Sequence, residues 1–352
     1  MQSDTDDNNA ILRAAVAGYG AYGRLHARKY LEHPEVRLVA IADPDPEKLR
    51  IARAELPGIR TVRDPGELAG LADLASIVAP ATHHRFIARR LLEGGVHLLV
   101  EKPFTASLAE ARDLAELAAA RGRVLQPGYL ERFNRTLGEL RARLPPPRYV
   151  EARRLTRWRD RGTDVNVIMD LMIHDIDMLL VITDSPVTRI QARGVRVFSD
   201  HWDVANAQLH FANGCVANLT ASRASPEPER RMHVFSDCAC ALADIDAGTL
   251  QLHQRREGAS GVVTECRFRH RGDPLASEID AFVQAVRNRR SPLVTAADAC
   301  RALGVAERIT GLMEQDADVV TRTAAPLTNS ERAIAYLLRQ HDRSRQQHRP
   351  HS

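Results

Sequence analysis

The sequence lacks long apolar runs, a secretory leader pattern and paired cysteines. None of its apolar stretches approaches the ~20 residues that a membrane-spanning helix needs, so we expect no membrane span. The first residues, MQSDTDDNNA, are acidic and polar rather than basic and then apolar, which argues against a signal peptide. The five cysteines show neither a C-x-x-C pair nor metal-ligand spacing, so we predict free thiols, a cytoplasmic location and no metal.

A strong charge of either sign is also missing. The formal net charge is +4 and the basic residues are not gathered into one block, so nucleic acid is not a predicted partner. Apolar residues make up 44% of the chain and charged residues 27%, as in ordinary globular proteins. Single cores rarely grow beyond roughly 250–300 residues. A chain of 352 residues therefore predicts two domains.

What the sequence does have is a glycine-rich turn near its start. An apolar run over residues 12–17 leads into Gly18, Gly20 and Gly23, and a helical pattern follows. Gly18 permits a tight turn, Gly20 lets a pyrophosphate approach the backbone, and Gly23 lets the helix pack near the strand. The free N–H groups at the start of the helix would face the phosphates. This order of strand, turn and helix predicts a dinucleotide site, the alternative being a purely structural turn.

The next predicted strand, over residues 36–42, ends at Asp43. A carboxylate in this place accepts hydrogen bonds from ribose hydroxyls and repels a 2′-phosphate, which favours NAD over NADP. The alternative is that Asp43 only caps the helix that follows. We also expect Ala21 and Tyr22, which stand between the glycines, to contact the cofactor.

Strands and helices alternate up to residue 127, which predicts an α/β domain with a doubly wound parallel sheet over residues 1–127. Ser107 and Glu110 have the spacing of a capping box at the start of one helix. Expected strands cover 12–17, 36–42, 59–62, 74–79 and 96–100, with another starting at 124, and expected helices cover 46–55, 83–92 and 107–121.

From residue 128 the pattern changes to alternating apolar and polar residues. This predicts an α+β domain with an open, mostly antiparallel sheet over residues 128–325, followed by a polar tail over 326–352. The pair Asn213-Gly214 between two alternating segments is a hairpin signal. Expected strands cover 149–158, 190–198, 205–211, 215–222 and 230–235, and expected helices cover 275–288, 296–313 and a short 331–340.

Two groups of residues carry possible chemistry, and the first is the triplet Glu101-Lys102-Pro103. It follows a predicted strand at the edge where open parallel sheets bind their ligands. A lysine amine in this place has access to a substrate hydroxyl and can share or relay a proton. The alternative is an ordinary surface lysine at a strand end.

The second group stands in the apolar segment 165–183, where Asp170, His174 and Asp177 recur at helical spacing. A histidine held by a carboxylate one turn away suits a general base, although the same stripe is compatible with an internal polar network. An Asp/His pair also occurs in metal sites, but no third ligand pattern accompanies it. Asp175 points away from the stripe, and we expect it to cap or to pair with an arginine.

Over roughly residues 11–315 the sequence resembles the Gfo/Idh/MocA family of nicotinamide-dependent sugar oxidoreductases. The resemblance rests on the glycine turn, on the Glu101-Lys102-Pro103 triplet and on the Asp170-x-x-x-His174 pair. It implies a Rossmann domain that binds NAD, with Lys102, Asp170 and His174 converging on the substrate hydroxyl as catalytic residues. It also implies a homodimer or homotetramer that buries the open sheet of the second domain. Further implied cofactor contacts are Pro80, His83, His84, Glu101 and Lys102.

Two segments, 128–135 and 169–177, resemble family members that act on UDP-sugars, in particular bacterial UDP-N-acetylglucosamine 3-dehydrogenases of the lipid A pathway. Arg135 departs from this pattern because it stands where proline is expected, and Pro127 also alters the strand end before it. Guanidinium groups suit bidentate contacts with a pyrophosphate, although a solvated strand face also explains the cationic stretch, which consists of Arg132, Arg153, Arg154, Arg157, Arg159 and Arg161. The predicted substrate contacts are Arg132, Asn134, Arg157, Asp170 and His174.

These features predict an NAD-dependent dehydrogenase that oxidises the 3-hydroxyl of UDP-N-acetylglucosamine. Three alternatives are compatible with the same residues. One is a dehydrogenase of another sugar, UDP-sugar or inositol, another is a non-catalytic NAD-sensing protein, and the third is a metal-dependent hydrolase.

Overall fold

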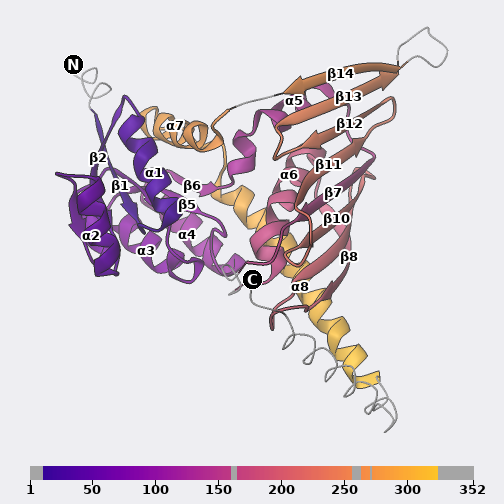
Figure 1. Ribbon diagram of the computed structural model, residues 1–352, viewed down its shortest axis with the longest axis horizontal. Helices are drawn as coiled ribbons and strands as arrows, with labels where there is room; N and C mark the ends of the chain where they lie inside the picture. The colour runs from indigo at the N-terminus through magenta and orange to yellow at the C-terminus, as the bar shows by residue number, and fades with distance from the viewer. Residues whose placement is uncertain (1–10, 160–164, 256–262, 270–271, 324–352) are drawn as a thin grey trace, which may run out of the picture. The chain divides into compact units, whose positions relative to one another are not determined.

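The computed structural model describes residues 11–159, 165–255, 263–269 and 272–323 (Figure 1). The chain divides into two units, Met1–Leu312 and Met313–Ser352, and both sheets and all described helices belong to the first unit apart from the end of the last helix. The predicted tail over 326–352 and its helix over 331–340 lie outside the described residues. In the part of the chain that the structure describes, no helix is long and apolar enough to cross a membrane.

Six parallel strands form the first sheet in the order β3-β2-β1-β4-β5-β6, which confirms the predicted doubly wound sheet. The order reverses between β1 and β4, so the carboxyl ends of these strands open the crevice in which such sheets bind ligands. The strands are β1 (Leu12–Ala17), β2 (Val36–Ala42), β3 (Arg60–Val62), β4 (Leu74–Ile77), β5 (His97–Glu101) and β6 (Leu125–Gly128). The helices between them are α1 (Ala21–Glu32), α2 (Pro46–Glu55), η2 (Pro65–Gly70), α3 (Ala81–Glu93) and α4 (Leu108–Ala120).

Local sequence explains where two of these helices begin. The Asp45 carboxylate accepts the N–H of Glu47 at 2.9 Å and caps α2. The Ser107 hydroxyl accepts the N–H of Glu110 at 3.3 Å, and the Glu110 carboxylate accepts the N–H of Ala106 at 3.2 Å. The predicted capping box therefore forms, with its returning bond displaced by one residue.

Eight strands form the second sheet in the order β14-β13-β12-β11-β7-β10-β9-β8. Only β7 and β10 pair in parallel among the described neighbours, which confirms the mostly antiparallel prediction. The predicted hairpin joins β9 to β10, with Gly214 at a φ of 85°. The strands are β7 (Tyr149–Leu155), β8 (Val187–Val195), β9 (Val204–Phe211), β10 (Val216–Ser222), β11 (Glu229–Phe235), β12 (Ala239–Asp244), β13 (Thr249–Arg255) and β14 (Val263–Arg269).

The sequence did not predict β12, β13 and β14, which extend the sheet beyond β11. Buried and more exposed residues do alternate along β12 and β13, but their alanines and polar residues give a weak strand signal. The remaining helices are η3 (Leu130–Phe133), α5 (Arg135–Arg143), η4 (Ile168–Met172), α6 (Ile173–Thr183), α7 (Pro274–Arg287) and α8 (Ala296–Thr323).

Helix α7 follows the second sheet in sequence but belongs to the core of the first. Its buried residues Ile279, Phe282 and Val283 share one apolar cluster with Val16 of β1 and Tyr30 of α1. This packing ties the end of the chain's second half to the Rossmann layer, near α1 in Figure 1. The predicted domain boundary between residues 127 and 128 stays a prediction.

Candidate active site

The end of strand β5 and the helical turn η4 meet at Lys102. Lys102 directly follows β5, and its Nζ donates to the backbone oxygen of Asp170 at 2.9 Å and to the Asp170 Oδ1 at 3.0 Å. Both side chains keep 26% of their surface exposed. The junction therefore lies at the carboxyl edge of the parallel sheet and is open to a small molecule.

Asp170 and His174 are presented by a change of helix type. Asp170 lies in η4, a single π-helical turn, and His174 lies in the first turn of the α-helix α6 that continues from it. Asn166 supports the turn because its Oδ1 accepts the N–H of Met169 at 2.9 Å. Turns of this type often occur at functional sites, since they re-aim side chains that a regular helix would stack.

The ring of His174 is neutral and one of its nitrogens has no hydrogen-bond partner among the described residues. Burial, followed by the charges of Arg154, Lys102 and Arg230, holds the pKa of His174 well below its usual value. Its Nδ1 is buried and makes no hydrogen bond with the described residues. A neutral imidazole with a vacant nitrogen is able to accept a proton.

The sequence predicted that the Asp170 carboxylate would hold the ring of His174, but in the structure it binds Lys102. No hydrogen bond joins the two side chains in the described structure, and Oδ1 of Asp170 is instead engaged by Lys102. The physical reason is the ammonium charge, because a charge-assisted bond to Lys102 is stronger than a bond from a neutral imidazole. Asp170 therefore fixes the amine rather than the ring.

Two buried ion pairs hold α6 under the site. Arg154 donates to the Asp175 carboxylate at 2.9–3.1 Å and to Glu131 at 3.0 Å, which confirms that Asp175 pairs with an arginine. Arg132 binds Asp177 through two bonds, from Nε at 2.7 Å and from Nη2 at 2.6 Å. Asp177 thus serves an internal ion pair, and the predicted substrate contact of Arg132 shares its guanidinium with that pair.

The three glycines of the turn are glycines for different reasons. Gly18 has a φ of +102°, and a Cβ there would lie 2.5 Å from the Val78 carbonyl oxygen, so the fold itself requires glycine. At Gly23 a Cβ would collide with the carbonyl oxygen of Gly18. At Gly20, the N-cap of α1, a Cβ would meet no atom of the described chain within 4 Å. The open space at Gly20, in front of the helix N-terminus, fits a dinucleotide pyrophosphate.

Asp43 lies where the second strand ends and is only 3% exposed. Its carboxylate accepts the N–H of Tyr19 at 2.8 Å and the N–H of Asp45 at 3.0 Å, and the Lys48 ammonium lies 3.5 Å away. Asp45, not Asp43, caps the following helix. Asp43 braces the glycine turn, and its contact with an adenosine ribose stays a prediction.

The other predicted cofactor residues lie around the same crevice. Ala21 and Tyr22 form the first turn of α1, and Tyr22 is 37% exposed. Pro80 and His83 lie at the start of α3, where His83 is exposed. His84 is buried, and its ring nitrogens face the carbonyl oxygens of Pro103 at 2.9 Å and Ala79 at 2.7 Å. Its ring therefore joins the end of β4 to the segment after Lys102.

A buried chain of hydrogen bonds, missed by the sequence reading, supports Glu101. Tyr30 bonds Ser76 at 2.7 Å, Ser76 bonds His26 at 3.0 Å, and the second nitrogen of His26 bonds Glu101 at 3.1 Å. The other Glu101 oxygen accepts the N–H of Lys102 at 3.2 Å. The one available signal was the histidine on the apolar face of the first helix.

Asn134 and Arg157, predicted to contact substrate, both bond to the protein itself. Asn134 caps α5 by accepting the N–H of Thr136 at 3.0 Å and lines a separate cavity of about 500 Å³. Arg157 is exposed and donates to the Pro226 carbonyl at 2.8 Å. Their substrate contacts stay predictions.

Comparisons with known proteins identify the family of the chain. The family model for the oxidoreductase family with an NAD-binding Rossmann fold matches residues 12–129, and that for the GFO/IDH/MocA C-terminal domain matches residues 136–239. The chain is 37% identical over 284 residues to UDP-N-acetylglucosamine 3-dehydrogenase from Acidithiobacillus ferrooxidans, covering 79% of this chain and 90% of that protein. It is 26% identical to the NAD-dependent scyllo-inositol 2-dehydrogenase of Bacillus subtilis, covering 82% and 90%.

Solved structures give the same result. UDP-N-acetylglucosamine 3-dehydrogenase GnnA from Acidithiobacillus ferrooxidans superimposes with a TM-score of 0.80 at 35% identity, over 86% of this chain and 98% of that one. Myo-inositol 2-dehydrogenase from Lactobacillus plantarum, at 20% identity and a TM-score of 0.74 over 87% of this chain and 98% of that one, shares the fold. The chain belongs to the Gfo/Idh/MocA oxidoreductase family and is an NAD-dependent dehydrogenase.

Proposed function

We propose that this dehydrogenase oxidises the 3-hydroxyl of UDP-N-acetylglucosamine to a 3-keto sugar. The observation that carries the proposal is the meeting of Lys102 with Asp170, next to the neutral His174, at the carboxyl edge of the parallel sheet. The choice of substrate is supported by the 37% identical relative of that activity.

In the proposed reaction His174 accepts the proton of the substrate hydroxyl. Burial, with the cations Arg154 and Lys102, disfavours the charged ring, so His174 is neutral before the reaction and has a nitrogen that can take up this proton. Lys102 has three N–H donors, of which Asp170 engages two, and the third is available to the substrate oxygen. That bond stabilises negative charge on the oxygen as the carbonyl forms. NAD⁺, when bound, supplies the hydride acceptor.

The diphosphate of the substrate needs donors as well. Arg132 donates from Nε and Nη2 to the Asp177 carboxylate, so its Nη1 is the group that would donate to a phosphate oxygen. Asn134 and Arg157 are proposed as further contacts on the strength of the sequence resemblance.

A second candidate substrate is an inositol, because the chain is also 26% identical to scyllo-inositol 2-dehydrogenase. Inositol has no diphosphate, so the two substrates make different demands on Arg132. If inositol is the substrate, the rate of turnover should therefore not change when the free Nη1 donor of Arg132 is lost.

The deciding experiment follows NADH formation with UDP-N-acetylglucosamine, other UDP-sugars and inositols, with NAD⁺ and NADP⁺ in parallel. We expect turnover of UDP-N-acetylglucosamine with NAD⁺ and a product lighter by two hydrogens, with the ketone at C3 by NMR. Faster turnover of inositol would overturn the substrate, and no NADH with any hydroxyl compound would favour an NAD-sensing protein. Hydrolysis of the substrate that stops when a chelator is added would favour a metal-dependent hydrolase.

Lys102→Met tests the catalytic assignment. We expect this variant to lose at least about 100-fold in kcat, the order expected for one positioned proton-transfer or charge-stabilising group, while NAD⁺ affinity stays within about twofold of wild type. Lys29→Met is the matched control, since Lys29 pairs with Glu32 and Asp273 on the surface. Loss of NAD⁺ binding with kcat preserved would contradict the role of Lys102.

The proposed function extends to the next reaction, the cellular location and the assembly of the protein. The 3-keto product is suited to an aminotransferase that installs a 3-amino group, as in the lipid A pathway. The free thiols of Cys215, Cys238, Cys240 and Cys300 support a reducing, cytoplasmic location. The open face of the second sheet is proposed to pair with another copy of the chain.

A further inference from the structure

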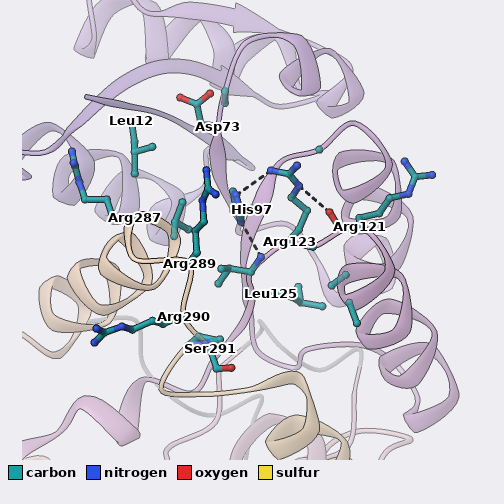
Figure 2. Close-up of a pocket in the computed structure, with 18 of the residues that line it drawn as sticks. Leu12, Asp73, His97, Arg121, Arg123, Leu125, Arg287, Arg289, Arg290 and Ser291 are labelled. Carbon is teal, nitrogen blue, oxygen red and sulfur yellow. Dashed lines mark hydrogen bonds between the residues drawn. The ribbon is translucent and has the colours of Figure 1, made fainter. Parts of the chain in front are cut away.

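A second cavity lies at the amino ends of the strands of the Rossmann sheet, the end opposite to Lys102. It has a volume of about 1110 Å³ and is bordered by Leu12, His97 and Leu125, which begin β1, β5 and β6 (Figure 2). The connection between α7 and α8 closes its other side, with Arg289 and Arg290. In a parallel sheet this edge is remote from the carboxyl ends of the strands, so the cavity is distinct from the active site.

The walls of this cavity are strongly basic. Asp73 is the one carboxylate among its described lining residues, and Arg13 neutralises it with bonds of 2.7 Å and 3.2 Å. The other lining guanidinium groups are those of Arg121, Arg123, Arg287, Arg289 and Arg290. The cavity therefore carries an excess of positive charge that its own residues do not balance.

Three of these arginines bond to the protein itself, Arg123 through its Nε, which donates to the Arg121 carbonyl oxygen at 3.2 Å. Arg121 donates to the Glu93 carbonyl at 3.0 Å, at the end of α3, and Arg287 lies 3.3 Å from the Glu35 carboxylate. Cations at helix carboxyl ends commonly serve such purposes. Arg289 and Arg290 differ, because both side chains are exposed and neither has an ion-pair partner among the described residues.

The backbone of Arg289 is also unusual. It has a φ of 49°, in the left-handed region, directly after Asn288 caps α7. Glycine is the usual residue at this place in a helix end, and any other side chain is strained there. Arg289 therefore lines the cavity in a backbone conformation that costs stability for any residue with a Cβ. A role for its charge in the cavity would offset this cost.

His97 supplies the observation that points to a ligand. Its Nδ1 accepts the N–H of Val124 at 2.9 Å, and burial, aided by Arg123, lowers the pKa of the ring to about 4. A neutral ring that accepts at Nδ1 carries its proton on Nε2. That Nε2–H lies 3.2 Å from Nη1 of Arg123, which is also only a donor (Figure 2). Two partly buried donors thus face each other without an acceptor between them among the described residues.

We propose that this cavity is a second, anion-binding site for a small molecule that carries a phosphate or pyrophosphate group. One phosphate oxygen would accept from both His97 Nε2–H and Arg123, which satisfies the facing donors. Guanidinium forks are suited to phosphate, and Arg289 and Arg290 supply further charge at the same cavity. The site does not depend on the proposed substrate of the dehydrogenase.

The test measures binding of inorganic pyrophosphate to the full chain by calorimetry, with NAD⁺ saturating so that the dinucleotide site is blocked. The first variant combines Arg289→Gly with Arg290→Gln. Glycine suits the left-handed conformation at residue 289, so this variant keeps the fold while it removes two charges. We expect its affinity for pyrophosphate to fall by about tenfold or more, whereas Arg141→Gln, which removes an exposed charge from α5 outside the cavity, should change nothing.

A second measurement reports on His97 directly. We expect pyrophosphate to shift the Nε2–H resonance of His97 in ¹⁵N-histidine NMR spectra of the wild type, and the shift to be lost in Arg123→Gln. Absence of pyrophosphate binding, or binding that the double variant leaves unchanged, would overturn the proposal. Binding to anionic phospholipid vesicles without binding of free pyrophosphate would overturn it too, because the surface would then recognise a membrane.

Discussion

Gly20 and Gly23 separate the needs of the cofactor from the needs of the fold. A Cβ at Gly23 would strike the carbonyl oxygen of Gly18, so the packing of α1 on β1 forbids it. A Cβ at Gly20 would enter open space, and the backbone there, with φ −74° and ψ −170°, is accessible to any residue. A dinucleotide seated against the turn would give Gly20 a reason to be glycine, because its pyrophosphate would occupy that space.

This difference predicts opposite outcomes for two serine variants. Gly20→Ser should leave the free energy of unfolding within about 0.5 kcal/mol of wild type, because serine is a good helix N-cap, and should weaken NAD⁺ binding by about tenfold or more through a clash with the pyrophosphate. Gly23→Ser should lower the free energy of unfolding by about 2 kcal/mol or more through backbone collision. Urea denaturation and NAD⁺ titration measure both effects, and unchanged NAD⁺ affinity in Gly20→Ser would remove the pyrophosphate from that position.

How far single residues could be predicted depends on whether their role is local. The glycine turn and the position of Lys102 after a strand follow from neighbouring residues, and the structure agrees with both. The pairing of Lys102 with Asp170 across 68 residues, and the commitment of Arg132 to Asp177 across 45, depend on how distant segments pack. A sequence pattern shows that a charged residue is present, but not which residue of opposite charge it pairs with in the folded chain.

At the scale of elements, the connection between β8 and β9 is organised by one carboxylate. Asp203 accepts the N–H groups of Val197, Phe198 and Ser199 at 2.6–2.9 Å, and Nε of Arg223 donates to it at 2.8 Å. Burial alone would raise the pKa of Asp203, but the bonds from Ser199, Phe198 and Arg223 outweigh it and hold the pKa well below its usual value. The ionised carboxylate is therefore a stabilising part of the native sheet edge.

Asp203→Asn should lower the free energy of unfolding by about 3 kcal/mol at pH 7, because the variant removes the charge of a buried carboxylate that Arg223 and three backbone N–H groups bind. A carboxylate with a depressed native pKa stabilises the protein above its unfolded pKa of about 3.9 and loses that contribution as the pH falls further. The gap between wild type and variant should thus narrow below about pH 4. Urea titrations at neutral and acid pH measure it, with Asp200→Asn, an exposed position in the same connection, as control. An equal gap at both pH values would contradict the account.

The elements that the sequence predicted best were those with strong local signals. Helix α4 began at its predicted cap, Ser107, helix α2 covered its predicted residues 46–55, and the β9–β10 hairpin formed at Asn213-Gly214. The π-helical turn η4 has no such signal, since it results from how Asn166 and the neighbouring apolar residues pack. It is nevertheless the feature that separates Asp170 from His174 and assigns the carboxylate to Lys102.

At the scale of the whole molecule, the second sheet is covered on one face only. Helix α5 contacts β12 and β13, and η4 contacts β10, while the opposite face carries no helix among the described residues (Figure 1). Aromatic residues gather on that face, where the ring of Phe235 lies 5.9 Å from Tyr149 and 6.0 Å from His233. Exposed aromatic clusters on a sheet are suited to pairing with a symmetry-related copy.

The proposed pairing predicts that the wild type elutes as a dimer or tetramer of the 39.1 kDa chain in size-exclusion chromatography with light scattering. Phe235→Glu should shift it toward the monomer, because a charge buried in a symmetric interface occurs in every copy and is left unpaired. Phe86→Glu is the control, since Phe86 is 62% exposed on α3 and lies outside the second sheet. A monomeric wild type would remove the need for a partner on this face. An oligomer that survives Phe235→Glu but not Phe86→Glu would place the interface on the Rossmann layer instead.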